Sequence, residues 1–165
     1  MHQKSREYIR ELMLERHVEG GYYRETYRGE EILFTKNTLS KKLKRRSTST
    51  LIYFLLDGND KSHFHKLKSD EIWHFYDGCD IKLYSIDKKG NLSEQILGKK
   101  SKNFQVIIPK NTWFAAELTN KKLFALVGCT VSPGFDYKDF EIGKREELIN
   151  QYPNYKSIIK KFTKC

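Results

Sequence analysis

The segment SHFHKLKSDEIWHFYDG, residues 62–78, holds the side chains best suited to chemistry. His63 and His65 are two residues apart, so on a β-strand both imidazoles lie on one face. Glu71 lies six residues after His65. This separation leaves room for a turn and a return strand, which would bring the Glu71 carboxylate beside the two imidazoles. Such a trio can bind a transition metal such as Fe, Mn, Ni or Zn. It can equally perform acid–base work, because an imidazole beside a carboxylate in a partly dry cavity has a tunable pKa near neutrality.

Neighbouring positions on the same strand are candidates for contacting a ligand. If Glu71 faces inward, Trp73 and Phe75 also do, and His74 faces the other surface of the sheet. A β-bulge would reverse this pattern, and bulges are common near functional sites. We therefore include both Trp73 and His74 among the candidate substrate-binding residues.

A second group of candidates lies nearer the N-terminus. Strand alternation groups Tyr22 with Arg24, and a buried arginine could recognise a carboxylate or a phosphate. The alternative is a structural salt bridge from Arg24 to Glu19 or Glu25. Tyr53 lies among apolar residues, where its hydroxyl either enters the cavity or its ring packs in the core. We include Tyr22, Arg24 and Tyr53 as candidate substrate-binding residues.

Short strands separated by turn residues must position these side chains. A helix is predicted over residues 5–16, with Ser5 as its cap, and Gly20-Gly21 ends it. From there to about residue 132 the pattern is typical of strands. The predicted strands are 21–28, 31–38, 49–57, 62–67, 70–77, 80–87, 92–98, 103–108, 112–119 and 122–132.

The C-terminal part has a helical pattern. Lys144 to Gln151 reads as one helix, and Pro153 can start another that ends near Phe162. Because the central strands have no helices between them, we expect an all-β sandwich or barrel rather than a parallel α/β fold. The chain is predicted to be one domain, with an N-terminal helix in 1–20, a β-body in 21–132 and a helical tail in 133–165.

Composition limits the class of protein. The chain has 165 residues, 38% hydrophobic and 32% charged, which indicates one globular domain. The net charge of +10 raises the question of nucleic-acid binding, but the positive residues are mostly dispersed lysines. The dense run has no aromatic partner to stack on bases, so we expect a solvated loop and no nucleic-acid partner. That run consists of Lys41, Lys42, Lys44, Arg45 and Arg46.

Cysteine usage and hydropathy suggest a location. Cys79, Cys129 and Cys165 are odd in number and widely spaced, which favours free thiols in a reducing compartment. Cys129 reads as a small buried hydrophobe rather than a nucleophile. The first residues show no secretory signal, and the apolar run at 51–56 is far shorter than a membrane span. We therefore expect a cytoplasmic protein that does not contact a membrane.

Two motifs resemble those of the cupin superfamily. The first combines Gly58, the pair His63 and His65, Glu71 and Gly78. The second is PKNTWF at 109–114. It resembles the cupin segment that normally supplies a further metal-binding histidine at the position of Phe114. This resemblance implies a double-stranded β-helix, the cupin jelly-roll barrel. It also implies that a divalent metal on His63, His65 and Glu71 would bind only weakly, since phenylalanine cannot coordinate it. Phe114 is instead a candidate substrate-binding residue.

Four longer blocks resemble the fifth cupin family, a group of small single-domain cupins of unknown function. They are HVEGGYYRETYR at 17–28, STSTLIYFLL at 47–56, SDEIWHFYDG at 69–78 and LVGCTVSPGFDYKDFEIG at 126–143. The resemblance implies a jelly roll like that of the dTDP-sugar 3,5-epimerases and seed-storage cupins, assembled as a homodimer. It does not imply an established reaction.

Three functions remain open at this level. The protein is an epimerase-like or isomerase-like enzyme acting on a polar metabolite such as an activated sugar, a metal-dependent oxygenase, or a ligand-binding protein without chemistry. In the first, His65 or His63 is the base, Glu71 orients it, and a tyrosine is the acid. In each case the partner is a small-molecule ligand.

Overall fold

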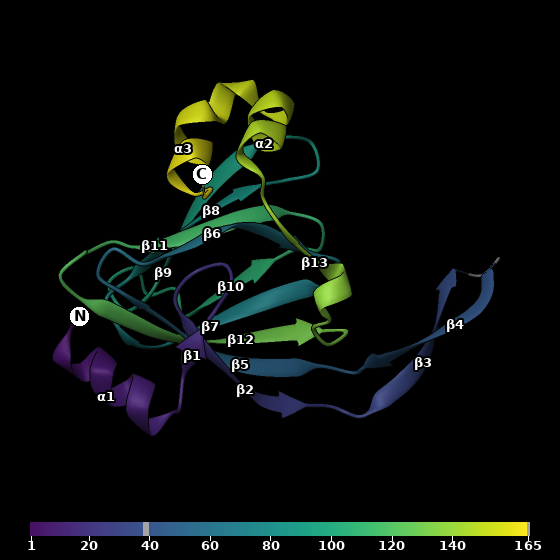
Figure 1. Ribbon diagram of the computed structural model, residues 1–165, viewed down its shortest axis with the longest axis horizontal. Helices are drawn as coiled ribbons and strands as arrows, with labels where there is room; N and C mark the ends of the chain where they lie inside the picture. The colour runs from purple at the N-terminus through teal and green to yellow at the C-terminus, as the bar shows by residue number, and fades with distance from the viewer. Residues whose placement is uncertain (38–39, 165) are drawn as a thin grey trace.

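The computed structural model describes residues 1–37 and 40–164, and within this range the side chains of 32–44 are not described. The chain forms a two-layer β-sandwich with helices near its ends (Figure 1). This confirms the prediction of an all-β fold with terminal helices. The strands are β1 (Glu15–Arg16), β2 (Tyr22–Arg28), β3 (Glu31–Asn37), β4 (Ser40–Ser47), β5 (Thr50–Asp57), β6 (Lys61–Leu67), β7 (Asp70–Gly78), β8 (Ile81–Ile86), β9 (Leu92–Leu97), β10 (Gln105–Ile108), β11 (Trp113–Leu118), β12 (Phe124–Ser132) and β13 (Phe140–Ile142).

Two antiparallel sheets face each other across the core. One sheet has the order β1-β2-β5-β12-β7-β10, and the other has the order β13-β6-β11-β8-β9. Phe54, Trp73 and Phe114 are among the fully buried side chains between them. All ten strands predicted from the sequence are present with small shifts at their ends; residue 38, at the end of one of them, lies outside the described residues.

A hairpin of β3 and β4 extends from the body of the sandwich (Figure 1). It contains the basic run that we predicted to be a loop. That prediction is wrong for the backbone, which pairs with β3 from Glu31 opposite Ser47 and has a register shift between Thr35 and Asn37. The side chains of Lys41, Lys42 and Lys44 lie outside the described residues. The sequence missed β4 because strand formation here depends on pairing with β3 rather than on an apolar face of its own.

The N-terminal helix begins and ends earlier than predicted. Helix α1 spans Gln3–Glu11, and the side chain of His2 caps it by accepting a hydrogen bond from the Lys4 amide at 3.2 Å. Ser5, the predicted cap, is buried and donates its hydroxyl hydrogen bond to Asp57. Residues 15–16, assigned to the helix from the sequence, form β1 instead.

The helices cover parts of the two outer faces of the sandwich. Helix α1 packs over Leu55, Phe124 and Leu126 of the six-stranded sheet. The C-terminal helices α2 (Arg145–Gln151) and α3 (Lys156–Lys161), joined by the 3-10 helix η2 (Pro153–Tyr155), pack on the five-stranded sheet around Phe162. This confirms the predicted helical tail. No helix in the described part of the chain is long and apolar enough to cross a membrane.

Candidate functional site

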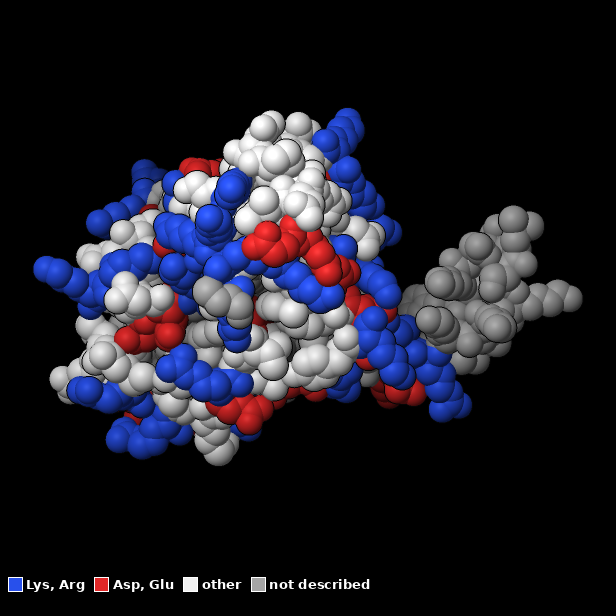
Figure 2. Space-filling view, turned by 45° about the horizontal axis from the view of Figure 1, so that its top comes forward, with Lys and Arg blue, Asp and Glu red and all other residues white. Residues whose placement is uncertain are grey.

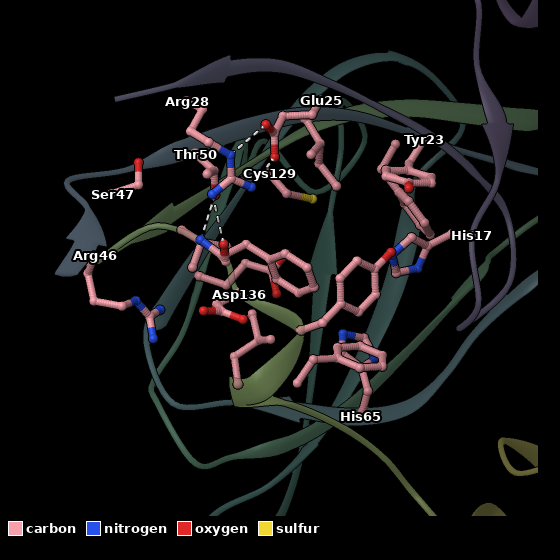
Figure 3. A pocket seen from close by; sticks show the side chains of 18 of the residues that line it. His17, Tyr23, Glu25, Arg28, Arg46, Ser47, Thr50, His65, Cys129 and Asp136 are labelled. Carbon is pink, nitrogen blue, oxygen red and sulfur yellow. Dashed lines mark hydrogen bonds and ion pairs between the residues drawn. The ribbon is translucent and has the colours of Figure 1, made fainter. Parts of the chain in front are cut away.

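A cavity of about 320 Å³ opens between the two sheets (Figure 3). Its walls come from β2, β5, β7 and β12 of one sheet and from β6 of the other. The segment from Phe135 to Phe140, which includes the 3-10 helix η1 (Tyr137–Asp139), closes one side. A volume of this size is typical of a small-molecule site.

The turn before β2 places Glu19 in this cavity. The Glu19 carbonyl accepts hydrogen bonds from the His63 amide at 2.8 Å and from Nδ1 of His63 at 2.6 Å. Gly20 follows with φ +111°, and a Cβ there would lie 2.0 Å from the Lys61 carbonyl oxygen. Only glycine therefore allows the turn to lie this close to β6. The close approach points the Glu19 side chain at His65.

Glu19 and His65 form a buried pair. Nε2 of His65 lies 3.1 Å from Oε2 of Glu19, while its Nδ1 lies 2.8 Å from the His63 carbonyl oxygen. Because the carbonyl can only accept, Nδ1 of His65 carries a proton. A hydrogen bond between Nε2 of His65 and Oε2 of Glu19 requires a second proton on one of these two atoms.

Other polar groups complete the surroundings of Glu19. The Ser62 hydroxyl donates to its Oε1 at 2.9 Å, and Nδ1 of His17 lies 3.4 Å from its Oε2. Burial alone would raise the pKa of Glu19, but His65, His17 and Ser62 together lower it below its ordinary value. Burial lowers the pKa of His65, and Glu19 opposes that effect.

Glu71 is the other carboxyl group in the cavity, and its pKa shifts in the opposite direction. Burial raises the pKa of Glu71 to about 8, and the charge of Glu19 adds to this, against weaker effects from Cys129 and Trp73. Its Oε2 is buried and finds no hydrogen-bond partner among the described residues. Glu71 is therefore protonated at neutral pH and has an O–H group to donate to a ligand.

The donor set does not fit a metal ion. His63 lies outside the cavity, with its Nδ1 turned to the Glu19 carbonyl, and both nitrogens of His65 face protein acceptors. Within the described residues, no group of three His, Cys, Asp or Glu side chains could hold a metal. Phe114 is fully buried, and its ring centroid lies 4.0 Å from that of His65. The structure therefore does not assemble the trio of His63, His65 and Glu71 proposed from the sequence.

Ion pairs surround the mouth of the cavity (Figure 3). Arg28 donates to both carboxylate oxygens of Glu25, at 2.8 and 2.6 Å, and to the Phe135 carbonyl at 3.1 Å. Arg46 pairs with Asp139 and donates to the Gly134 carbonyl at 2.6 Å. These contacts attach the 133–139 segment to the base of the β3–β4 hairpin and so fix the shape of the opening.

Three substrate-binding candidates face away from the cavity. Tyr22 lies under the Arg16 guanidinium, whose carbon is 3.9 Å from the ring centroid, and Arg24 donates to the Leu12 carbonyl at 3.2 Å. Tyr53 packs against Tyr76 with 6.0 Å between ring centroids. The alternate positions on β2, Tyr23 and Glu25, line the cavity instead. Periodicity groups residues into two faces, but it does not tell which face is inside.

The remaining candidates on β7 divide as strand alternation predicts. Trp73 is fully buried in the core, and its indole nitrogen lacks a hydrogen-bond partner in the described part of the chain. His74 lies on the outer face of the sheet, where its Nε2 is 3.0 Å from Oγ1 of Thr130 and Nε2 of Gln105 is 3.2 Å from its Nδ1. Neither Trp73 nor His74 is among the described residues that line the cavity.

Several cavity residues were not singled out from the sequence. His17, Tyr23 and Arg28 line the cavity, and Glu19 was considered only as a salt-bridge partner for Arg24. Gly20-Gly21 was a usable signal, because a glycine pair marks a place where the backbone can approach a neighbour closely. The bulge between Glu25 and Tyr27 was not detectable, and it turns Arg28 to the cavity side.

Cys129 is buried, as expected, and its thiol points into the cavity from β12 (Figure 3). Burial raises the pKa of this thiol well above its ordinary value, and the nearby Glu71 adds to the effect. A protonated thiol is a poor nucleophile. Cys79 is also a free cysteine, and Cys165 lies outside the described residues.

Comparison with known proteins gives this β-sandwich a family. Residues 6–143 match the Cupin superfamily (DUF985), so the chain belongs to that family and its sandwich is a cupin jelly roll. A protein from Shewanella oneidensis, known from a crystal structure, is 37% identical, with a TM-score of 0.83 and 96% of each chain covered. A hypothetical protein from Leishmania major is 30% identical, with a TM-score of 0.85 over 96% of this chain and 98% of that one.

More distant likeness concerns the fold alone. Oxalate decarboxylase from Bacillus subtilis is 14% identical, with a TM-score of 0.56 over 89% of this chain and 36% of that chain. No curated protein matches the sequence. Within the family, then, the function must be argued from the residues of the cavity.

Proposed function

We propose that this protein is an enzyme that binds a small polar metabolite in the cupin cavity and isomerises or epimerises it by proton transfer. One observation carries the proposal: Glu19 and Glu71 share one enclosed cavity, and their pKa values are shifted in opposite directions. Two titratable groups separated in this way can act as a base and an acid at the same pH.

The roles follow from which group holds a proton. Glu71 gives its proton to a carbonyl oxygen of the metabolite, and the Glu19–His65 pair takes a proton from the adjacent carbon. The electrons of the broken C–H bond form a carbon–carbon double bond, and the carbonyl oxygen becomes a hydroxyl. Return of a proton to the other face of the same carbon, with the enol hydroxyl proton going back to Glu71, restores the carbonyl and gives the epimer. Return of a proton to the former carbonyl carbon, with the proton of the neighbouring hydroxyl passing to Glu71, gives the isomer. No oxidant or metal takes part.

These roles differ from those expected from the sequence. His65 was the expected base and Glu71 the group orienting it, but both nitrogens of His65 are occupied and Glu19 holds the ring. A tyrosine was the expected acid. Tyr137 beside Tyr23 raises the pKa of the Tyr23 hydroxyl, which makes it a weaker acid than Glu71. The oxygenase alternative has no support in the donor set described above.

Exchange of carbon-bound hydrogen with D2O tests the proposal. The protein is incubated in D2O with a panel of ketoses, aldoses and keto acids, and deuterium uptake is followed by mass spectrometry. We expect deuterium at a carbon next to a carbonyl for at least one compound. Glu71→Gln and Glu19→Gln should each reduce the exchange rate by about a hundredfold or more, the usual contribution of a general acid or base.

A matched control separates catalysis from fold. Glu94 is an exposed carboxylate on β9 that pairs with Lys82 at 2.5 Å, away from the cavity. Glu94→Gln should leave exchange unchanged. Binding of a compound without deuterium uptake would refute the enzyme proposal and leave the protein as a ligand-binding cupin.

A further inference from the structure

The surface and the cavity of this protein differ in charge. The chain carries a net charge of +10, and Lys and Arg are spread over the face shown in Figure 2. A small anion would be attracted to such a molecule at long range. Whether the cavity would stabilise such an anion depends on whether the cationic side chains there are already paired with carboxylates.

The histidines inside the cavity face a carboxylate. Nε2 of His65 and Nδ1 of His17 lie 3.1 and 3.4 Å from Oε2 of Glu19. Glu71 is protonated because of its burial. Ile52, Phe54 and Val131 supply apolar wall. Among the described residues, this interior wall lacks an unpaired positive group that could replace the hydration shell of an anion.

Arg28 and Arg46, which also line the cavity, are paired within the protein. Each of the three nitrogens of Arg28 donates a hydrogen bond within the protein, two to Glu25 and one to the Phe135 carbonyl. Arg46 is paired with Asp139. Asp136 adds a further negative charge to the lining.

Glu31 and Arg45, which have opposite signs, also line the cavity. Both side chains are exposed, so water and salt screen them. They do not give the opening a net preference for an anion.

We infer that the cavity takes an uncharged polar ligand with a hydrogen-bond acceptor, such as a free sugar or an amide, and discriminates against anions such as sugar phosphates. An anion entering the cavity would lose its water without gaining a free cation, and that loss is costly. An uncharged carbonyl or hydroxyl oxygen can accept the hydrogen bond from Glu71, whose Oε2 is buried and unpartnered in the described structure. This class rests on the proposed function, and it excludes nucleotide-activated sugars from the candidate substrates.

Matched pairs of probes test the inference by binding alone. The pairs are D-glucose with D-glucose 6-phosphate, D-ribose with D-ribose 5-phosphate, and pyruvamide with pyruvate; glucosamine is the cationic probe. Binding is measured by calorimetry or ligand-observed NMR at physiological salt. We expect at least one uncharged member to bind about tenfold or more tightly than its anionic partner. Anionic members that bind as tightly, or tighter binding of glucosamine than of glucose, would overturn the inference. Failure of every uncharged probe at millimolar concentration would do so too.

One substitution should reverse the preference. Glu25→Gln removes the charge that neutralises Arg28 and leaves a cation at the mouth. We expect the affinity for the phosphorylated members to rise about tenfold relative to the uncharged ones. Glu141→Gln is the matched control, because Glu141 pairs with Lys66 at 3.0 Å and lies outside the cavity. An equal response of both variants would contradict the inference.

The two proposals can fail separately. Uncharged probes that bind without deuterium exchange would refute the enzyme and leave the ligand class standing. Exchange on a phosphorylated compound that binds more tightly than its uncharged partner would support the enzyme and refute the ligand class.

Discussion

Oε2 of Glu19 lies 3.1 Å from Nε2 of His65, and this contact joins the turn before β2 to the middle of β6. The opposite side of the imidazole ring is fixed by the His63 carbonyl. Two aromatic rings lie close to it, with centroids of Phe114 at 4.0 Å and Phe140 at 5.6 Å. His65 is thus held by contacts in its plane and by packing around it.

Truncation and isosteric replacement of Glu19 should have different effects. Glu19→Ala leaves Nε2 of His65 and the Ser62 hydroxyl buried without their partner, which should cost roughly 3–5 kcal/mol of unfolding free energy. Glu19→Gln should cost about 1 kcal/mol, because its amide can donate to a neutral His65 and accept from Ser62. Urea unfolding measures both. Equal losses would mean that the pair is not hydrogen-bonded as described.

Gly20 should tolerate a side chain far less well than another glycine of similar conformation. Gly20 and Gly90 both have positive φ, at +111° and +85°. A Cβ at Gly20 would lie 2.0 Å from the Lys61 carbonyl oxygen, whereas at Gly90 the nearest atom is 3.6 Å away. We expect Gly90→Ala to cost about 1 kcal/mol from backbone strain and Gly20→Ala to cost roughly 3 kcal/mol or more. Thermal unfolding of the two variants compares them, and similar melting temperatures would refute the close approach.

The sequence was sufficient for most of the fold because local signals repeat along it. Turn residues such as those at Lys89-Gly90-Asn91 separate short apolar runs, and that pattern predicts strands without knowledge of their partners. Strand β4 was missed because it is basic and lacks such a signal. Its formation depends on pairing with β3.

The site could be predicted only in part. His65 and Glu71 lie in a recognisable motif on neighbouring segments, and both line the cavity. Glu19 reaches His65 only because a distant turn packs on β6, and such a contact leaves no trace in local periodicity. The packing of α1 on the outer face of β2, where Tyr22 lies, decides which side chains of β2 point into the cavity. The alternation of residues along β2 does not reveal this packing, and for that reason we chose Tyr22 instead of Tyr23.

Glu71 should make stability fall as pH rises. Its folded pKa of about 8 lies above the ordinary value of 4.5, so the folded protein binds more protons than the unfolded chain between these values. The stability from protonated Glu71 is complete below pH 4.5 and is lost as pH rises through about 8, by an upper estimate of roughly 4–5 kcal/mol. The unfolding free energy of the wild type should therefore fall relative to Glu71→Gln, which does not titrate. Parallel pH profiles of the two proteins would contradict the shifted pKa.

The outer face of the six-stranded sheet is the surface on which we propose that two copies of this chain form a dimer. Tyr76, Phe104 and Ile107 are 48%, 50% and 61% exposed there, next to the uncharged groove around His74. Two molecules of net charge +10 repel each other, so they should associate through a face with few charges. In a two-fold dimer the same patch meets itself, and one substitution changes both sides of the interface.

Ile107→Asp tests this dimer, because it would place two carboxylates against each other across the two-fold axis. Light scattering at micromolar concentration should show a dimer for the wild type and a monomer for the variant. Val18→Asp is the control: Val18 is 51% exposed but belongs to the N-terminal segment, and its substitution should leave the dimer intact. A monomeric wild type would refute the proposal. Loss of the dimer in both variants would mean that the outer sheet face is not the specific interface.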